Sequence, residues 1–160
     1  DLAVVSITGG KPKVGFDIKE LIADIESFLE YDNTHDAIIV GVGALGKAFL
    51  GYKGFDNYGL NIVAGFDVNP DICGTSISAK PVLDISKLKD YVQRLNIKIG
   101  IIATPNKFAQ STVDLLIDSG IKAIWNFANT HIDVPNGIEL KNEDLAASLA
   151  LLSIKLKSGH

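Results

Sequence analysis

Cysteine is nearly absent from this chain of 160 residues, which has only Cys73. A single thiol cannot form an intrachain disulfide, so a small scaffold stabilised by disulfides is excluded. No run reaches the roughly 20 uninterrupted apolar residues that cross a bilayer, which excludes a membrane-spanning helix. The sequence also lacks an opening charged segment followed by an apolar one, so we expect the protein in the cytoplasm.

Net charge is small as well. Charged residues make up 21% of the chain, hydrophobic residues 47%, and the net charge is −4. This composition excludes a disordered chain. An acidic balance also provides no basic face for phosphates, so this stretch is not expected to hold nucleic acid by itself. The length fits one domain, or one domain with a short appendage.

Patterns of catalytic or metal-binding residues are missing. Of the three histidines, His35 precedes the first apolar strand of the main domain and His160 is terminal, while His131 lies in a predicted loop, where a surface histidine is the simpler interpretation. Cys73 has no Cys or His partner at metal-ligand spacing, and we interpret it as an inert small residue. Neither a Ser-His-Asp arrangement nor a pair of carboxylates can be argued. We therefore expect no catalytic residues, no metal, and binding without turnover.

The chain does contain a regular alternation of short apolar segments and helices. Unbroken apolar strands are buried on both faces, which indicates a parallel sheet covered by helices on each side. We predict a Rossmann-like, doubly wound and mainly parallel α/β domain over residues 36–141, with only a turn and a glycine-bearing loop over residues 69–84. The predicted strands are residues 37–40, 60–66, 99–103, 123–125 and 138–140. One predicted helix follows the first strand to about residue 52, and two others span residues 85–95 and 107–119.

The flanking segments differ from this domain. Residues 1–16 predict a short hairpin, which is marginally stable alone and so belongs to something larger. Residues 17–35 predict an amphipathic linker helix that begins with a capping box. Residues 142–160 predict a helix that Asn142 caps and that is apolar nearly all round. Such a helix must be buried on more than one side, so we expect a homodimer in which it packs on the partner chain.

A glycine motif follows the first predicted strand of the domain. Gly41-Val42-Gly43-Ala44-Leu45-Gly46 is a GxGxxG sequence between a strand and a helix, which is the context in which this motif binds a dinucleotide. The first glycine permits a tight turn, Gly43 lets a pyrophosphate approach the backbone, and Gly46 allows close packing of helix on sheet. The helix N-terminus offers N–H groups to the phosphates. A glycine-rich turn without a ligand is the alternative.

Polar residues at other strand ends extend this candidate site. Asp67 ends the second predicted strand, where a dinucleotide fold has the carboxylate that binds ribose hydroxyls. That carboxylate would repel a 2′-phosphate and no arginine is adjacent, so NAD(H) is favoured over NADP(H); a solvated strand end is the alternative. Thr104-Pro105 and Asn126-Phe127 follow the next two predicted strands. Both are candidates for the nicotinamide side, and ordinary strand exits are an equal alternative.

Several blocks in order along the chain resemble one known family. GVGALGKAFLGYKGF, IVAGFDVNP, IIATPNKFAQ, GIKAIWNFAN, VPNG and NEDLA make the chain similar, from about residue 14 to residue 156, to the Rex family of redox-sensing transcriptional repressors. The resemblance implies a homodimer with an N-terminal winged-helix DNA-binding domain and a C-terminal Rossmann domain that senses NADH against NAD+. NADH binding would release operator DNA and NAD+ would compete. The C-terminal helix would be exchanged between subunits.

The resemblance also implies roles for single residues near the cofactor. Residues Gly41, Val42, Gly43, Ala44, Leu45 and Gly46 would hold the pyrophosphate, Asp67, Val68 and Asn69 the adenosine ribose, and Thr104 and Pro105 would lie near the nicotinamide half. The chain departs from the family in two places. Asn129-Thr130 replaces a frequent proline, and Trp125 replaces an aliphatic residue, so the shape of this loop is expected to differ.

Residues outside the cofactor site receive roles from the same resemblance. Tyr52 would lie near the dimer interface and meet Asp144 of the partner's exchanged helix, beside Leu145, in one ligand state only; packing of Tyr52 in the core is the alternative. Residues 1–16 would be the remnant of the wing. Its Lys11 and Lys13 would then lie near DNA phosphate, although an ordinary solvated turn is the better interpretation.

Two other functions remain open from the sequence. The first is the cofactor domain of a small NAD-dependent oxidoreductase. The second is a CoA-binding domain of the succinyl-CoA ligase type, which shares a related fold. Asp67 favours an adenosine ribose without a 3′-phosphate beside it. We expect the cofactor-sensing and dimerising part of a redox-responsive repressor.

Overall fold

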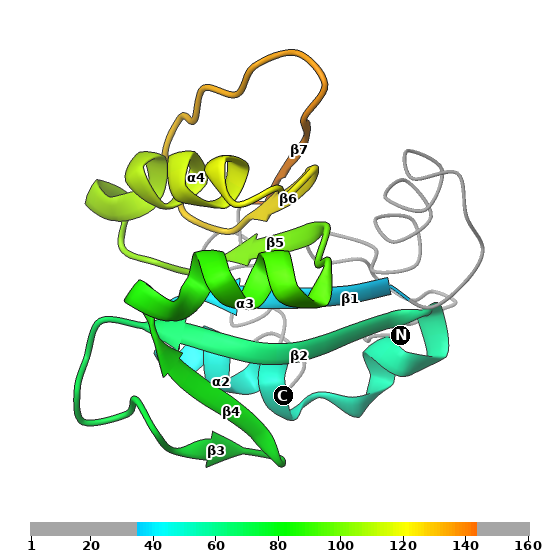
Figure 1. The fold of residues 1–160 in the computed structure, drawn as a ribbon, viewed down its shortest axis with the longest axis vertical. Coiled ribbons are helices and arrows are strands. Elements are labelled where there is room, and N and C mark those ends of the chain that lie inside the picture. Colours follow the sequence, from blue (N-terminus) through cyan, green and yellow to red (C-terminus); the bar gives the residue numbers. More distant parts are fainter. Residues whose placement is uncertain (1–34, 144–160) are drawn as a thin grey trace, which may run out of the picture.

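The computed structural model of this chain describes residues 35–143 (Figure 1). The predicted N-terminal hairpin with Lys11 and Lys13, the linker helix, and the C-terminal helix with Asp144 and Leu145 lie outside these residues. Within the described residues, the first strand begins at His35 and the last ends at Asn142.

A seven-stranded sheet forms the centre of the domain, in the order β3-β4-β2-β1-β5-β6-β7. Every neighbouring pair is parallel except β3 and β4. The predicted Rossmann-like, mainly parallel α/β fold is thereby confirmed. The strands are β1 (His35–Val40), β2 (Leu60–Asp67), β3 (Ser76–Ile77), β4 (Lys80–Asp84), β5 (Ile99–Ile102), β6 (Ala123–Asn126) and β7 (Glu139–Asn142).

Helices cover both faces of the sheet. Figure 1 shows α3 and α4 on the near face and α2 behind it. Short 3-10 turns precede α3 and α4 and follow α2, so each helix is slightly shorter than the hydrophobic pattern predicts. The helical elements are α2 (Ala44–Gly51), η1 (Lys53–Tyr58), η2 (Ile85–Lys87), α3 (Leu88–Leu95), η3 (Asn106–Phe108) and α4 (Ala109–Asp118).

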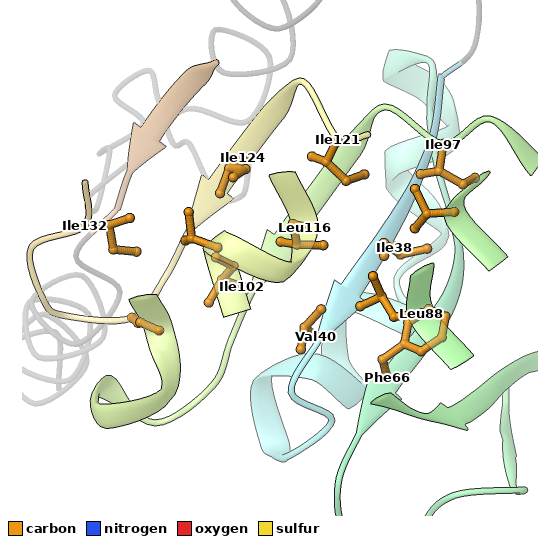
Figure 2. Packing of buried hydrophobic residues seen from close by; sticks show 14 of the residues in the cluster. Ile38, Val40, Phe66, Leu88, Ile97, Ile102, Leu116, Ile121, Ile124 and Ile132 are labelled. Carbon is orange, nitrogen blue, oxygen red and sulfur yellow. The ribbon is translucent and has the colours of Figure 1, made fainter. Parts of the chain in front are cut away.

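The core is divided into two parts by the sheet. In β1, Ile38 and Val40 contribute to the part beneath α3 and α4, which Figure 2 shows in close-up. Ala37 and Ile39 of the same strand contribute to the part beneath α2. All four side chains are buried. A strand that packs on both faces has no polar side to show, which is why its sequence is an unbroken apolar run.

Two strands, β3 and β4, lie where we predicted only a loop, and that prediction is wrong. The hydrophobic signal for these strands is weak, because Val82 is the one residue of β3 and β4 that is fully buried and Pro81 interrupts the apolar pattern. Pro81 is tolerated because its partner is Ser76 of the short edge strand β3. β4 instead gains its place in the sheet from parallel pairing with β2, where Val82 lies opposite Gly65.

The turn that joins β3 to β4 gives the first testable prediction. Ser78 and Ala79 have φ values of 52° and 68°, a left-handed pair that is typical of a type I′ hairpin turn. A Cβ in this region is strained, so Ala79→Gly is expected to raise the free energy of unfolding by about 1 kcal/mol, measured by urea denaturation. Gln93→Gly, in the exposed interior of α3, is the control and is expected to lower it by about 1 kcal/mol. Equal losses in the two variants would contradict the prediction.

None of the helices within residues 35–143 has the length and apolar character needed to cross a bilayer.

Candidate cofactor-binding site

The candidate site lies at the carboxyl ends of the central strands. The strand order reverses between β1 and β5, and in doubly wound sheets a ligand-binding crevice forms outside this point. The backbone brings the predicted residues together there. The N–H of Gly41 donates to the carbonyl of Phe66 at 2.8 Å, and the N–H of Ala103 donates to the carbonyl of Val40 at 2.8 Å. The turns that follow β1, β2 and β5 therefore meet at one edge.

The three motif glycines meet different surroundings. Gly41 has a φ of +99°, and a Cβ there would lie 2.6 Å from the carbonyl carbon of Ala103. A Cβ on Gly46 would lie 2.1 Å from the carbonyl oxygen of Gly41. At Gly43, by contrast, a Cβ would have nothing within 4 Å. The protein's own packing thus requires Gly41 and Gly46, whereas Gly43 leaves open backbone for something other than this chain.

The N-terminus of α2 follows this open backbone. Gly43 is its N-cap residue, no side chain caps it, and its first turn, within the described residues, has no acidic side chain. The first N–H groups of a helix have no partner inside the helix, and the helix dipole adds partial positive charge to them. An uncapped N-terminus beside an open glycine is a suitable place for a phosphate group.

Asp67 fixes the glycine turn as well as ending β2. Its Oδ2 accepts the N–H of Val42 at 2.7 Å, while its Oδ1 accepts the N–H groups of Val68 at 2.7 Å and Asn69 at 2.9 Å. A carboxylate has about four acceptor positions, so these bonds leave capacity for a further donor such as a ribose hydroxyl. The sequence predicted the position of Asp67 but not its bond to the glycine turn.

Cys73 lies in the turn after β2. Its Sγ donates to the carbonyl oxygen of Asp67 at 3.4 Å. Loss of solvent contact, together with the negative charges of Asp84 and Asp67, raises the pKa of the Cys73 thiol, which keeps it neutral and unreactive at ordinary pH. Within residues 35–143, no group of three or more His, Cys, Asp or Glu side chains is arranged to hold a metal ion.

Thr104 follows β5 and presents an unusual hydroxyl. Its Oγ1 is buried, and no group in the described part of the chain forms a hydrogen bond with it. A buried polar group without a partner costs about 1–3 kcal/mol, so it is uncommon unless a ligand or solvent completes it. Thr104 was predicted from its place at the strand end, but nothing in the sequence showed that its hydroxyl is unpaired. Pro105, the next residue, is exposed.

The pair Asn126-Phe127, the other candidate for the nicotinamide side, has a structural role. The fully buried side chain of Asn126 accepts the N–H of Ala128 at 2.9 Å and donates to its carbonyl at 3.2 Å. It also donates to Oδ1 of Asn142 at 2.9 Å. Asn142, which we predicted to cap the last helix, is the last residue of β7, and this bond joins it to β6. Phe127 packs on Trp125 with 4.7 Å between ring centroids.

Tyr52 and His131 both lie at the surface. The Tyr52 side chain is 45% exposed and its ring packs edge-on against Phe55, with 4.8 Å between centroids. Tyr52 is therefore not an aromatic of the core, and its predicted partner Asp144 lies outside the described residues. The exposed His131 has its Nε2 2.8 Å from Oδ1 of Asp133, which supports its interpretation as a surface histidine.

Comparison with known proteins defines the class of this domain. Residues 32–130, more than half of the chain, match the family model described as CoA binding domain, so this part belongs to that class of Rossmann-like domains. A search of curated proteins narrows the class. The chain is 41% identical over 158 residues to the redox-sensing transcriptional repressor Rex of Porphyromonas gingivalis, with 99% of the chain and 72% of that relative covered. The chain belongs to the Rex family.

Solved structures agree with this assignment. RSP, a Rex-family repressor, has been solved in complex with β-NADH; it is 37% identical with a TM-score of 0.72, over 90% of this chain and 70% of that one. Its complex with β-NAD+ and operator DNA is 36% identical, with a TM-score of 0.72 over 95% and 69% of the two chains. The resemblance to the Rex family that the sequence indicated is confirmed. The matched relatives of the chain are transcriptional regulators.

Proposed function

We propose that this chain is the part of a redox-sensing repressor that binds NADH and NAD+. In this proposal, NADH favours a dimer state that releases operator DNA. The proposal rests above all on the open backbone at Gly43, beside the uncapped start of α2. A pyrophosphate needs such a close approach to the backbone, and the carboxylate of Asp67 at the neighbouring strand end suits the adenosine ribose.

The two halves of the cofactor would lie on opposite sides of the switch point. Asp67, Val68 and Asn69 follow β2 and would hold the adenosine side, whereas Thr104 and Pro105 follow β5 and would line the nicotinamide side. When bound, the cofactor supplies a nicotinamide ring whose charge differs between NAD+ and NADH. A ligand shifts a two-state protein only through different affinities for the two states, so the β5 side must distinguish the two rings.

The remaining parts of the proposal concern residues beyond the described domain. Residues 144–160 would form the helix exchanged in a homodimer, with Asp144 of one subunit meeting Tyr52 of the other in one ligand state. Residues 1–16 would be the remaining wing of a winged-helix domain that binds operator DNA. The protein would act in the cytoplasm, without turnover of the cofactor.

Titration of the chain with NADH, followed by nicotinamide fluorescence, tests the cofactor assignment. Binding at micromolar or lower concentration is expected, with NAD+ competing. CoA is the necessary competitor because of the matched family model, and it is expected not to displace NADH. Displacement by CoA would support the CoA-binding alternative. Steady oxidation of NADH with small carbonyl compounds would support an oxidoreductase.

Thr104 gives a further prediction for the nicotinamide side. Thr104→Val keeps the shape of the side chain and replaces the unpaired hydroxyl by a methyl group. Without cofactor, the variant is expected to be as stable as the original chain or more stable by about 1 kcal/mol, measured by thermal unfolding. Its affinity for NADH is expected to fall about fivefold, whereas its affinity for ADP, which lacks the nicotinamide half, is expected not to change. A loss of stability without loss of NADH affinity would contradict a ligand-facing role.

A further inference from the structure

The loop between β6 and β7 has no regular secondary structure, yet three side-chain amides hold it. Each amide binds both the N–H and the carbonyl of a single loop residue, as a neighbouring strand would. The pairs are Asn126 with Ala128, Asn106 with Asn129, and Gln110 with Asp133. Two bonds from one planar group define both position and orientation of the peptide they hold.

Two of the amides come from the start of α4 and from η3 before it. Asn106 donates to the carbonyl of Asn129 at 3.0 Å and accepts its N–H at 2.9 Å. Gln110 donates to the carbonyl of Asp133 at 3.0 Å and accepts its N–H at 2.8 Å. Both pairs are separated by 23 residues, so the loop runs alongside one turn of helix. Between the two held residues Ile132 is buried in the core (Figure 2).

Of the two amides in η3 and α4, that of Asn106 is the nearer along the chain to the candidate site. Asn106 directly follows Thr104-Pro105, at the carboxyl end of β5, and its partner Asn129 lies in the loop that follows the neighbouring strand β6. Asp67 marks the adenosine side on the other side of the switch point. The nicotinamide half would therefore extend over the ends of β5 and β6, whose loops the amide of Asn106 joins.

We propose that Asn106 is a positioning residue for the nicotinamide half of the cofactor, an inference that rests on the proposed function. Its amide holds the loops after β5 and β6 together as one wall before any ligand binds. Without it, the backbone groups of Asn129 turn to water, the two loops move separately, and cofactor binding must order them. The adenosine half, which lies over β1 and β2, does not contact this wall and should not be affected.

Gln110 provides a matched control. It makes the same pair of bonds to the same loop, but it lies one helical turn further along, about 6 Å from Asn106 along the axis and away from the strand ends. Removal of the Gln110 amide loosens the distant part of the loop. If the contribution of Asn106 were only to general stability, the two alanine variants would behave alike.

The experiment measures NADH and ADP affinity, together with thermal unfolding, for the original chain, Asn106→Ala and Gln110→Ala. Asn106→Ala is expected to weaken NADH binding about tenfold, which corresponds to about 1.4 kcal/mol. ADP binding is expected to stay within about twofold. Gln110→Ala is expected to leave both affinities within about twofold. Asn106→Asp keeps the acceptor for the N–H of Asn129 but turns a second carboxylate oxygen toward the carbonyl of Asn129. It is therefore also expected to weaken NADH binding and to spare ADP binding, and it replaces the alanine variant if that variant does not fold.

Three results would overturn the proposal: unchanged NADH affinity in Asn106→Ala, equal losses for NADH and ADP, or equal losses in the Asn106 and Gln110 variants. Failure of the original chain to bind NADH would instead overturn the proposed function, which separates the two.

Discussion

Gly43→Ala is expected to lower the affinity for NADH about 100-fold while leaving the free energy of unfolding unchanged within about 0.5 kcal/mol. The added methyl group meets nothing within 4 Å in the chain itself, and the loss of a glycine N-cap is offset by the lower conformational entropy of the unfolded chain. It would, however, occupy the space through which a pyrophosphate approaches the start of α2, and separation from those N–H groups weakens every phosphate contact. Fluorescence titration and urea denaturation of the same preparation measure the two quantities.

Gly46→Ala is the control, because its first effect should be a loss of stability, and any loss of NADH affinity should follow from that. A Cβ there would lie 2.1 Å from the carbonyl oxygen of Gly41, so helix and turn must separate. We expect a loss of about 3 kcal/mol in the free energy of unfolding, with weaker NADH binding as a consequence. If Gly43→Ala bound NADH as the original chain does, the open backbone would not be a phosphate site.

Asp67→Ala is expected to lower both NADH affinity, about 100-fold, and stability, by about 2 kcal/mol. The carboxylate accepts backbone N–H groups of Val42, Val68 and Asn69, and these would lose their acceptor. The same change removes the group that would bind the adenosine ribose. NADH titration and thermal unfolding without cofactor measure the two effects. Asp67→Ala is expected to show both losses, whereas Gly43→Ala is expected to show only the loss of NADH affinity.

Asp67→Asn is the matched variant. Its Oδ1 can still accept the N–H groups of Val68 and Asn69, but its amide nitrogen faces the N–H of Val42. The stability loss should therefore be about half that of Asp67→Ala. Selectivity provides a second measurement, since the carboxylate is expected to exclude the 2′-phosphate of NADPH. Equal NADH and NADPH affinities in the original chain would contradict this role of Asp67.

The sequence was a good guide to the central strands and a poor one to β3 and β4, at one edge of the sheet. β1 and β5 are buried on both faces, and every residue of β5 is apolar or glycine, so their unbroken apolar runs predict them. β4 is held by parallel pairing with β2, and β3 by antiparallel pairing with β4. A strand such as β4, with Pro81 inside it and charged ends, has no local signal strong enough to distinguish it from a loop.

The candidate site, too, could be predicted from the sequence only in part. Gly41, Gly43 and Asp67 could be predicted because their roles follow from local backbone chemistry next to a strand. The unpaired hydroxyl of Thr104 and the amide bonds of Asn106 to Asn129 could not, since both depend on what lies beside them in space. Their sequence neighbours give no indication of those surroundings.

The central place of β1 has a consequence for the newly synthesised chain. β1 is made before the other described strands, but it pairs on one side with β5, where Ala37 lies opposite Ile99. Gly41 packs against Ala103 and Thr104, so the glycine turn cannot take its final shape until β5 has left the ribosome. Until then one edge of β1 is unpaired, and pairing between such distant segments is slow. A dinucleotide therefore cannot assist folding early in translation; it can stabilise only a sheet that has already closed.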